Sequence, residues 1–380
     1  MKINIIGGGP AGLYFALLMK QSDAAHDITL WERNAPDATF GWGVVFSGQT
    51  LAHLQAADAP THAAITAQFA RWDNVDVVHR GQKVTIHGNS FLGIGRLALL
   101  QILQARCREL AVKLNFQADV SDLATLEKCD LLIAADGVNS ATRQRYAAQF
   151  QPHLDLRPNR YIWYGTRQLF HGLTLTFCQN EAGTFSAHSY KFNDTTSTFI
   201  IECDAATWEK AGFAQMDDIT TRHYLEQVFA ADLDSYELLS NNSKWVQFPY
   251  LRNEHWHYRN IALLGDALHT AHFSIGSGTK LALEDAIALH TCCQQTDGVN
   301  DALALFEKLR RPVIEAYQAA AWESMLWFEN ARDYMHLEPM ELAYRLMTRS
   351  GTIDRERLRR RDPQFVAEYE KIAKVQPAAT

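Results

Sequence analysis

The sequence predicts an α/β protein in which a parallel, Rossmann-like sheet is interrupted by a second, mainly antiparallel sheet and followed by a helical C-terminal region. At the N-terminus, a strand, a glycine turn, a helix and a second strand follow one another within about 30 residues, the size of one βαβ unit. Short β-branched and aromatic runs separated by Gly, Asn and Asp fill residues 161–203, a pattern typical of antiparallel strands. From residue 278 to about residue 347 the pattern is mostly helical.

The expected parallel sheet is built from short apolar runs. Residues 2–6 and 28–31 are such runs, and they flank a helical stretch at 13–20. The runs DLLIAA at 130–135 and NIALL at 260–264 are apolar without alternation, as strands covered on both faces are. The other expected elements are a loop or bent strand at 40–48, one helix within 50–70, a helix at 96–110, a strand at 114–118 and a helix at 216–233.

The composition is that of a globular protein and excludes several classes of function. The chain has 380 residues, of which 47% are apolar and 21% charged, enough for two or three domains with large cores. A net charge of −7 disfavours a dedicated nucleic-acid binder. No apolar run is long enough to span a membrane, and the glycines of INIIGGGPAGLYFALLM interrupt what otherwise resembles a signal peptide. Six cysteines without a C-x-x-C pair indicate free thiols in the cytoplasm and no metal site.

The first motif of chemical interest is Gly7-x-Gly9-x-x-Gly12, between the first expected strand and the first expected helix. Glu32 closes the second strand. In this context the motif is the dinucleotide-binding fingerprint: the glycines allow a tight turn, a pyrophosphate lies at the helix N-terminus, and the carboxylate binds ribose hydroxyls. A glycine turn without a ligand is the plainer alternative.

Two further motifs begin directly after expected buried strands. They are DGVNSATR at 136–143 and GDALH at 265–269. Ligands of doubly wound sheets lie at the carboxyl ends of parallel strands, so Asp136 and Asp266 are expected near the nucleotide. Either aspartate alone is more often a helix cap, and their occurrence together with the glycine fingerprint favours the binding site.

These three segments, in this order and spacing, resemble the class A single-component FAD aromatic monooxygenases of the para-hydroxybenzoate hydroxylase type. The segments WERNAPDATFGWGVVFSGQTL, YIWYGT, GDALHTAHFSIGSGTKLALEDA and RRRDPQFVAEYEK are similar to the branch that acts on aromatic acyl-CoA thioesters. That branch includes salicylyl-CoA 5-hydroxylases and the N-terminal half of 2-aminobenzoyl-CoA monooxygenase/reductases. A more distant likeness is to tryptophan hydroxylases of violacein synthesis.

The resemblance implies a Rossmann-like FAD-binding domain, FAD as resident cofactor, NADH or NADPH as transient reductant and O2 as co-substrate. Arg96 matches an arginine that opens a helix and contacts FAD, and Asp266 matches an aspartate on the flavin ribityl chain. The residues expected to bind the cofactor are Gly7, Gly9, Pro10, Ala11, Gly12, Glu32, Arg33, Arg96, Asp136, Gly265, Asp266, Gly276, Ser277 and Gly278.

Catalytic and substrate-binding residues are expected beside the flavin and on the inserted sheet. An imidazole of near-neutral pKa suits the polarisation of a phenol or a peroxide, and a structural histidine is the alternative. The catalytic candidates are His269, His272 and Phe273, and the substrate-binding candidates are Tyr161, Trp163, Tyr164, His188 and Tyr190. The arginines of 355–361 are either a solvated charged helix or a site for CoA phosphates.

The implied activity is hydroxylation of an aromatic acyl-CoA thioester through a flavin C4a-hydroperoxide, in the first place salicylyl-CoA to gentisyl-CoA. The phenol oxygen directs attack to the para position, which is C5. The alternatives are a 2-aminobenzoyl-CoA or tryptophan- or indole-type hydroxylase, a non-hydroxylating flavoprotein reductase, and a non-enzymatic FAD-fold binder. We expect a cytoplasmic monomer or homodimer, and the absence of a reductase half within 380 residues favours a plain hydroxylase.

The expected domain division follows from the motifs. Residues 1–75, 96–155 and 259–295 form the FAD-binding domain, residues 76–95 and 156–258 form the substrate domain, and residues 296–380 form the C-terminal helical region.

Overall fold

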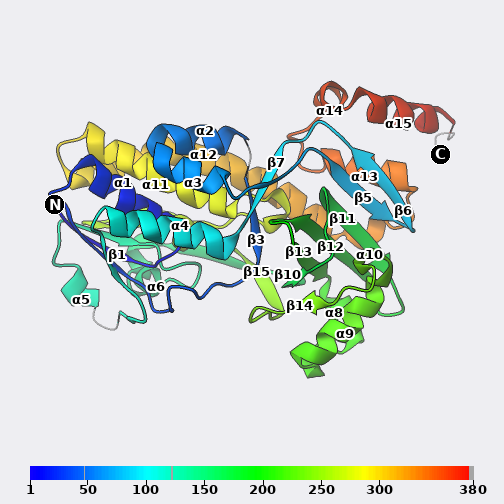
Figure 1. Ribbon diagram of the computed structural model, residues 1–380, viewed down its shortest axis with the longest axis horizontal. Coiled ribbons are helices and arrows are strands. Elements are labelled where there is room, and N and C mark those ends of the chain that lie inside the picture. The colour runs from blue at the N-terminus through cyan, green and yellow to red at the C-terminus, as the bar shows by residue number, and fades with distance from the viewer. Residues whose placement is uncertain (47, 121–122, 376–380) are drawn as a thin grey trace.

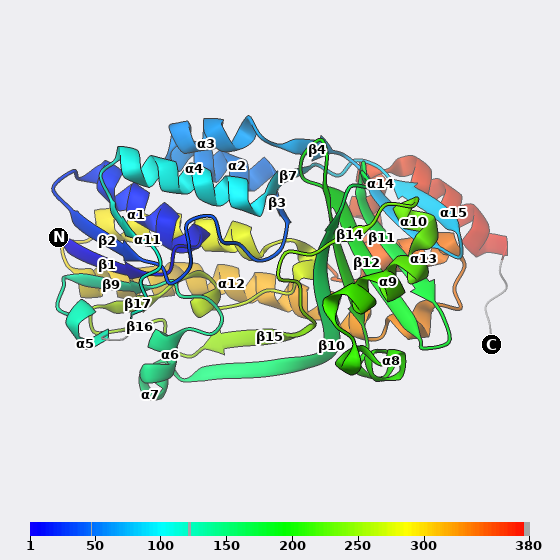
Figure 2. The ribbon, with the colours of Figure 1, turned by 60° about the horizontal axis from the view of Figure 1, so that its bottom comes forward.

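The computed structural model describes residues 1–46, 48–120 and 123–375. Two sheets lie at opposite ends of the molecule, and two long strands, β10 (Pro152–Thr166) and β15 (Val246–Asn253), run side by side between them (Figures 1 and 2). The α/β fold class expected from the sequence, with its mixed sheets and helical C-terminal region, is confirmed.

The first sheet is the expected parallel one and has the strand order β16-β17-β9-β1-β2-β8. All its pairs are parallel except β16 with β17 at one edge. The strands without alternating polarity are buried throughout, because helices cover the sheet. The bounds are β1 (Lys2–Ile6), β2 (Asp27–Trp31), β8 (Lys113–Asn115), β9 (Leu131–Ala134), β16 (His257–Tyr258) and β17 (Ile261–Leu263).

Helices pack beside this sheet (Figure 2), with α1 (Pro10–Ser22) against α4 (Arg96–Glu109) and α11 (Gly278–Gln295), and α11 against α12 (Val299–Glu329). The single helix expected within 50–70 is two helices, because Asp58 ends the first and caps the second by accepting from Thr61 N. The stretch expected as one helix at 216–233 is likewise divided. The remaining bounds are α2 (Gly48–Ala57), α3 (Ala59–Thr66), α5 (Leu123–Leu126), α6 (Ala141–Arg145), α7 (Ala147–Phe150), α8 (Ala205–Ala211), α9 (Asp218–Val228) and α10 (Ala230–Leu233).

The second sheet has the order β14-β10-β13-β12-β11-β5-β6, with β15 paired to β10. Its pairs are antiparallel except β11 with β5, so the mainly antiparallel sheet is joined by a hairpin from an earlier part of the chain. The bounds are β5 (Val75–His79), β6 (Gln82–Ile86), β11 (Leu173–Gln179), β12 (Thr184–Lys191), β13 (Ser197–Cys203) and β14 (Leu238–Leu239). This membership supports the domain division given above, which we propose for the chain.

A small third sheet, β3-β7-β4, connects the two halves. It contains β3 (Gly43–Phe46), β4 (Ala70–Trp72) and β7 (Phe91–Gly95). The expected bent strand at 40–48 is therefore β3 with its flanks, and Ser47 of that stretch lies outside the described residues.

Two tryptophans pack the segment of β3 against β10. Trp163 of β10 lies on Gly41, and Trp42 lies on Gly165 of β10. A Cβ at Gly41 would approach the ring of Trp163 to 2.8 Å, and a Cβ at Gly165 would approach the ring of Trp42 to 2.6 Å. The segments GWGVV and YIWYGT therefore pack together only because both positions lack a side chain. This packing fixes the position of β3 beside the inserted sheet.

The C-terminal helices α13 (Pro339–Thr348), α14 (Arg355–Arg361) and α15 (Pro363–Val375) lie beyond the second sheet (Figure 1). They share a hydrophobic core with β5, β6 and β11, in which Phe177 stacks on Phe328. Every helix in the described part of the chain is too short or too polar to span a lipid bilayer.

Candidate active site

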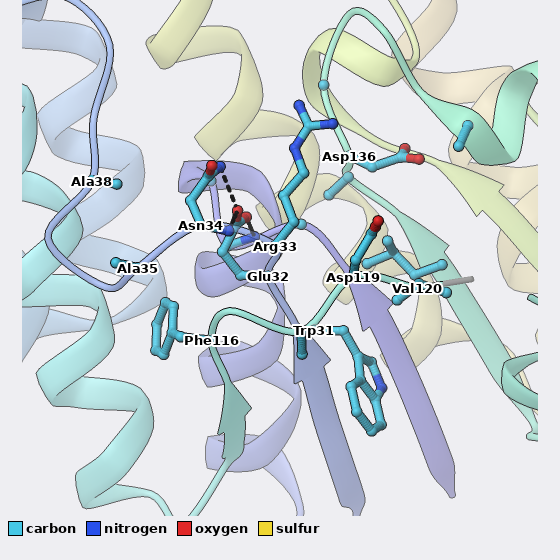
Figure 3. A pocket seen from close by; sticks show the side chains of 18 of the residues that line it. Trp31, Glu32, Arg33, Asn34, Ala35, Ala38, Phe116, Asp119, Val120 and Asp136 are labelled. Carbon is cyan, nitrogen blue, oxygen red and sulfur yellow. Dashed lines mark hydrogen bonds between the residues drawn. The ribbon is translucent and has the colours of Figure 1, made fainter. Parts of the chain in front are cut away.

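A cavity of about 430 Å³ lies at the carboxyl ends of β1, β2 and β9, the position at which doubly wound sheets bind nucleotides. Glu32 and Asn34 lie on one side of it and Asp136 on the other, with Arg33 extending between them (Figure 3). The glycine turn, the start of α4 and the segment after β8 complete the walls. The expected fingerprint, Glu32 and the motif after β9 therefore come together in one place.

The glycine turn is shaped by close approaches that only glycine permits. Gly7 has φ +109°, and a Cβ there would lie 2.1 Å from the carbonyl oxygen of Ala135. A Cβ at Gly12 would lie 2.2 Å from the carbonyl oxygen of Gly7. Gly9 is different, because a Cβ there would meet no protein atom within 4 Å. Gly7 and Gly12 therefore serve the fold, whereas Gly9 borders open space at the start of α1.

Two carboxylates are fixed at the walls of this cavity. Glu32 Oε2 accepts from Gly8 N at 2.7 Å, and its Oε1 accepts from the backbone and side-chain amides of Asn34, each at 2.7 Å. Asp136 Oδ2 accepts from the backbone and hydroxyl of Thr142 at 3.2 Å. Asp136 Oδ1 is buried without a partner among the described residues. Fixed carboxylate oxygens here suit the hydroxyls of a ribose.

A second cavity, of about 500 Å³, continues from the first toward the inserted sheet. The two share Gly9, Arg96, Ala135 and Gly137 as lining residues, so together they form one extended groove. Gly9 of the glycine turn lies where the two cavities join, which suits a dinucleotide whose pyrophosphate lies at the N-terminus of α1. Of the residues expected to bind the cofactor, all but Gly12 and Gly265 line one or both cavities.

The opposite charges of Asp266 and Arg96 attract each other at this groove. Asp266 follows β17, and its side chain is open to solvent where it lines the cavity. Burial by the surrounding protein raises the pKa of Asp266, and the nearby charge of Arg96 opposes the rise. The carboxylate of Asp266 lines this second cavity together with Arg96. A carboxylate so placed is available to the hydroxyl groups of a bound ligand.

The register of the second sheet builds an apolar and aromatic wall for this cavity. Residues paired across four strands form one row on the same face, namely Leu175, His188, Ile200 and Trp163, and all four line the cavity. Tyr161 and Tyr190 line it too. Tyr164 lies on the opposite face of β10, where its hydroxyl donates to Asp218 at 3.0 Å, because successive side chains of a strand alternate.

The catalytic candidates divide in a similar way. Phe273 lines the cavity and its ring lies 4.7 Å from that of Tyr161. His269 Nε2 lies 2.7 Å from Asp285 Oδ2, and His272 Nδ1 lies 2.8 Å from Ser274 Oγ. Neither histidine lines either cavity. The structure thus gives both imidazoles partners within the protein, and a catalytic role for them stays a prediction.

Two polar residues of this region were missed by the sequence reasoning. Arg349, just after α13, lines the cavity and donates to Ser324 Oγ and the carbonyl oxygen of Ser274. Glu202 of β13 lies behind His188, with its Oε2 3.9 Å from His188 Nε2. A carboxylate in the otherwise apolar run STFIIEC was the only sequence signal for Glu202, and Arg349 had none.

A dinucleotide groove that opens into an aromatic chamber is typical of oxidoreductases that hold a dinucleotide cofactor beside their substrate. A family profile described as an FAD binding domain matches residues 112–321. The chain is 40% identical over 377 residues to salicyloyl-CoA 5-hydroxylase of Streptomyces sp, covering 96% of this chain and 72% of that one. It is 35% identical over 349 residues to protodeoxyviolaceinate monooxygenase of Chromobacterium violaceum, covering 90% and 92%. The chain belongs to the FAD-dependent aromatic monooxygenases.

Solved structures show the same fold. The tetrameric form of 2-methyl-3-hydroxypyridine-5-carboxylic acid oxygenase matches with a TM-score of 0.70 over 95% of both chains, at 19% identity. Because the FAD binding domain profile matches more than half of the chain, FAD is the cofactor of this chain, and the residues present fit it. The open space at Gly9, the unpartnered Oδ1 of Asp136 and the cavity-facing carboxylate of Asp266 lie along one groove.

The first prediction concerns Asp266. We expect Asp266→Ala to purify with much less flavin, because it removes a charged hydrogen-bond acceptor worth about 1.5–3 kcal/mol, or roughly 10–100-fold in affinity. The ratio of flavin to protein absorbance and a titration of apoprotein with FAD measure this. The control Asp194→Ala changes an aspartate of an exposed turn. Wild-type flavin content in Asp266→Ala would remove that residue from the binding site.

Proposed function

We propose that the chain uses NAD(P)H and O2 to hydroxylate an aromatic acyl-CoA thioester, in the first place salicylyl-CoA at C5. The proposal is supported by the shape and charge of the second cavity. Its inner end carries the flavin-binding residues and its walls are aromatic, whereas its other lining residues include Thr352, Ile353 and the exposed Arg361. A ring therefore has an apolar chamber, and a long anionic tail has an outlet beside a basic helix.

The outlet lies at the arginine-rich helix α14. Arg361 donates to Asn89 Oδ1 at 3.1 Å, and Asn89 also lines the cavity. Arg357 donates to the carbonyl oxygen of Thr352 at 2.6 Å. This hydrogen bond ties α14 to a residue that lines the outlet. Guanidinium groups form strong charge-assisted bonds to phosphates, and CoA carries several phosphates. The arginines of 355–361 are therefore proposed to meet the CoA moiety.

The chemistry divides between cofactor and protein. Bound FAD supplies the redox chemistry by which NAD(P)H and O2 become an oxygen atom delivered to the ring. The protein residues orient the substrate: the row of side chains from Leu175 to Trp163 forms an apolar and aromatic wall for the ring. Phe273 packs directly against Tyr161 and His188 at this wall. These apolar walls also exclude water from the reacting position. The phenolic oxygen of the substrate then directs hydroxylation to the para carbon.

The second prediction tests the substrate class. We expect salicylyl-CoA to stimulate NAD(P)H oxidation with equimolar hydroxylated product, and free salicylate to stimulate it at least about tenfold less, since it lacks the tail that α14 binds. Steady-state kinetics with product analysis by mass spectrometry measure both. Equal rates with the free acid contradict the thioester proposal, and preference for a tryptophan-derived indole favours the alternative substrate. NAD(P)H oxidation without hydroxylated product favours a flavoprotein reductase.

A matched pair of variants distinguishes binding of the CoA tail from binding of the aromatic ring. Arg361→Ala is expected to raise the KM for salicylyl-CoA several-fold with little change in kcat, because it removes one phosphate contact. Arg332→Ala, an exposed arginine outside the cavity lining, is the control. We further propose that the protein acts in the cytoplasm as a monomer or homodimer. The six unpaired cysteines support the reducing compartment, and light scattering tests the oligomeric state.

A further inference from the structure

We propose that Glu202 is a positioning residue that, through His188, sets whether the substrate pocket donates a proton to the phenolic oxygen or accepts one from it. This inference rests on the proposed function, because it concerns the phenol of the substrate. It assigns a role to a buried carboxyl group that the binding of FAD and the aromatic wall leave unused.

The geometry places the two side chains in series. His188 on β12 and Glu202 on β13 are diagonal neighbours on the face of the sheet that lines the cavity, since Ile200 pairs with His188 and Tyr161 pairs with Glu202. His188 lines the cavity, whereas Glu202 lies behind it. Both are more than nine-tenths buried. His188 therefore faces the cavity, and Glu202 acts on the cavity only through His188.

Both facing atoms lack a partner. His188 Nε2 and Glu202 Oε2 lie 3.9 Å apart, and each is buried without a hydrogen bond among the described residues. The other carboxyl oxygen, Glu202 Oε1, accepts from Asn159 Nδ2 at 2.8 Å, which anchors the group. Buried polar atoms are almost always paired, so a small rotation that joins Nε2 to Oε2 is favoured. The remaining ring nitrogen, His188 Nδ1, is then left for the ligand in the cavity.

The protonation state of Glu202 sets the direction of both hydrogen bonds. When the carboxyl group is protonated, its O–H donates to Nε2, so Nδ1 carries the ring proton and donates to the ligand. When the group is ionised, it accepts from Nε2–H, and the lone pair of Nδ1 accepts the proton of the phenol. The phenolic O–H bond then breaks, an N–H bond forms at Nδ1, and the imidazolium pairs with the carboxylate.

Burial raises the pKa of Glu202 to about 8, with Asn159 opposing the rise and Glu329 adding to it. Burial, together with the charge of Arg349, lowers the pKa of His188 to about 3. The unliganded pair is therefore neutral on both sides below pH 8, and Glu202 ionises above it. The pocket therefore donates a hydrogen bond to the phenolic oxygen below pH 8 and accepts the phenolic proton above it.

The charged groups around the pair favour an anion in the cavity. From α12, Glu329 faces the pair, but Arg157 on β10 neutralises it through two hydrogen bonds of 2.9 and 2.7 Å. From the end of α13, Arg349 has hydrogen bonds only to a hydroxyl and to carbonyl oxygens, and no carboxylate of the described residues pairs with it. The neutral rings of Phe273, His272 and Phe328 complete the surroundings. The uncompensated charge of Arg349 thus stabilises a phenolate.

A further prediction follows from this pair and uses the FAD-loaded enzyme with salicylyl-CoA, without NAD(P)H. Ionisation of the bound phenol is followed by difference absorption between about pH 6 and about pH 10, beside a titration of the free thioester. We expect a wild-type midpoint near pH 8, where Glu202 ionises. In Glu202→Gln the amide donates permanently to Nε2, so the midpoint is expected to rise by about one pH unit or more.

Asp232→Asn is the matched control, since burial also raises the pKa of this carboxyl group but it lies outside the cavity lining. It is expected to keep the wild-type midpoint. His188→Asn is a second variant that removes the base itself, and the same loss of phenolate is expected. A wild-type enzyme that does not bind the thioester overturns the proposed function and this inference together. Binding with the same midpoint in Glu202→Gln, His188→Asn and wild type overturns this inference alone.

Discussion

Replacing Gly9 by valine is expected to abolish FAD binding while the protein stays folded. Gly9 lines both cavities, and a Cβ at this position meets no protein atom within 4 Å. Its backbone, at φ −77° and ψ 178°, is ordinary for any residue. The new side chain therefore fills only the space that the pyrophosphate needs at the N-terminus of α1. Losing about two charge-assisted bonds of 1.5–3 kcal/mol each lowers the affinity for FAD by at least about 100-fold.

The measurement has two parts that separate binding from folding. Flavin content and an FAD titration report the affinity, and thermal unfolding of the apoprotein reports the stability. The apoprotein is expected to change by no more than about 1 kcal/mol, because the substitution adds no clash. Gly48→Val is the control, since that exposed glycine also has nothing within 4 Å. If Gly9→Val retains FAD at wild-type stoichiometry, the pyrophosphate does not lie at this turn.

The residues at the cofactor end of the site could be predicted from the sequence, because short-range sequence patterns determine their positions. The turn around Gly7 needs glycines wherever it occurs, and Glu32 and Asp266 follow apolar runs that form parallel strands. Carboxyl ends of such strands meet at one edge of the sheet, so spacing along the chain is enough to bring these residues together. The break at Asp58 between α2 and α3 was missed, although an aspartate beside a proline-containing helix start is a capping signal.

The substrate end was only partly accessible, because it depends on strand register and on packing between distant segments. Alternation along β10 is enough to place Tyr161 and Trp163 on one face and Tyr164 on the other. The contact between His188 and Glu202, by contrast, can be predicted only if the exact register of β12 against β13 is known. Arg349 reaches the cavity only because α13 packs against the second sheet, which no local pattern encodes.

His269 belongs to the predicted GDALH motif, but its hydrogen bond favours a structural role over a catalytic one. It follows Asp266 closely, but it is bonded to Asp285 of α11, which also accepts from Arg310 Nε at 2.8 Å. Arg310 also pairs with Glu284, which pairs with Lys280. This buried network joins α11 and α12 to the segment that carries Asp266. Its geometry supports a structural contribution of His269, through the position of the flavin-binding loop.

Asp285→Ala is therefore expected to cause the largest loss of stability, about 3–5 kcal/mol, because it leaves the buried Arg310 with one partner fewer and His269 with none. Burial raises the pKa of Asp285, but the charges of His269 and Arg310 outweigh burial and hold it below its usual value. A carboxyl group with a lowered pKa stabilises the fold above its unfolded pKa of about 3.9, and the contribution is lost as the pH falls through the folded value.

The difference in unfolding free energy between wild type and Asp285→Ala is thus expected to be full at neutral pH and to shrink below about pH 4. Urea denaturation across this range measures it, with Asp297→Ala, an exposed aspartate after α11, as a control that stays within about 0.5 kcal/mol of wild type. The double variant Asp285→Leu with Arg310→Met removes both charges, so it is expected to be more stable than Asp285→Ala. A double variant as unstable as the sum of its single changes would show that the two charges do not interact, and that side-chain volume between α11 and α12 carries the stability instead.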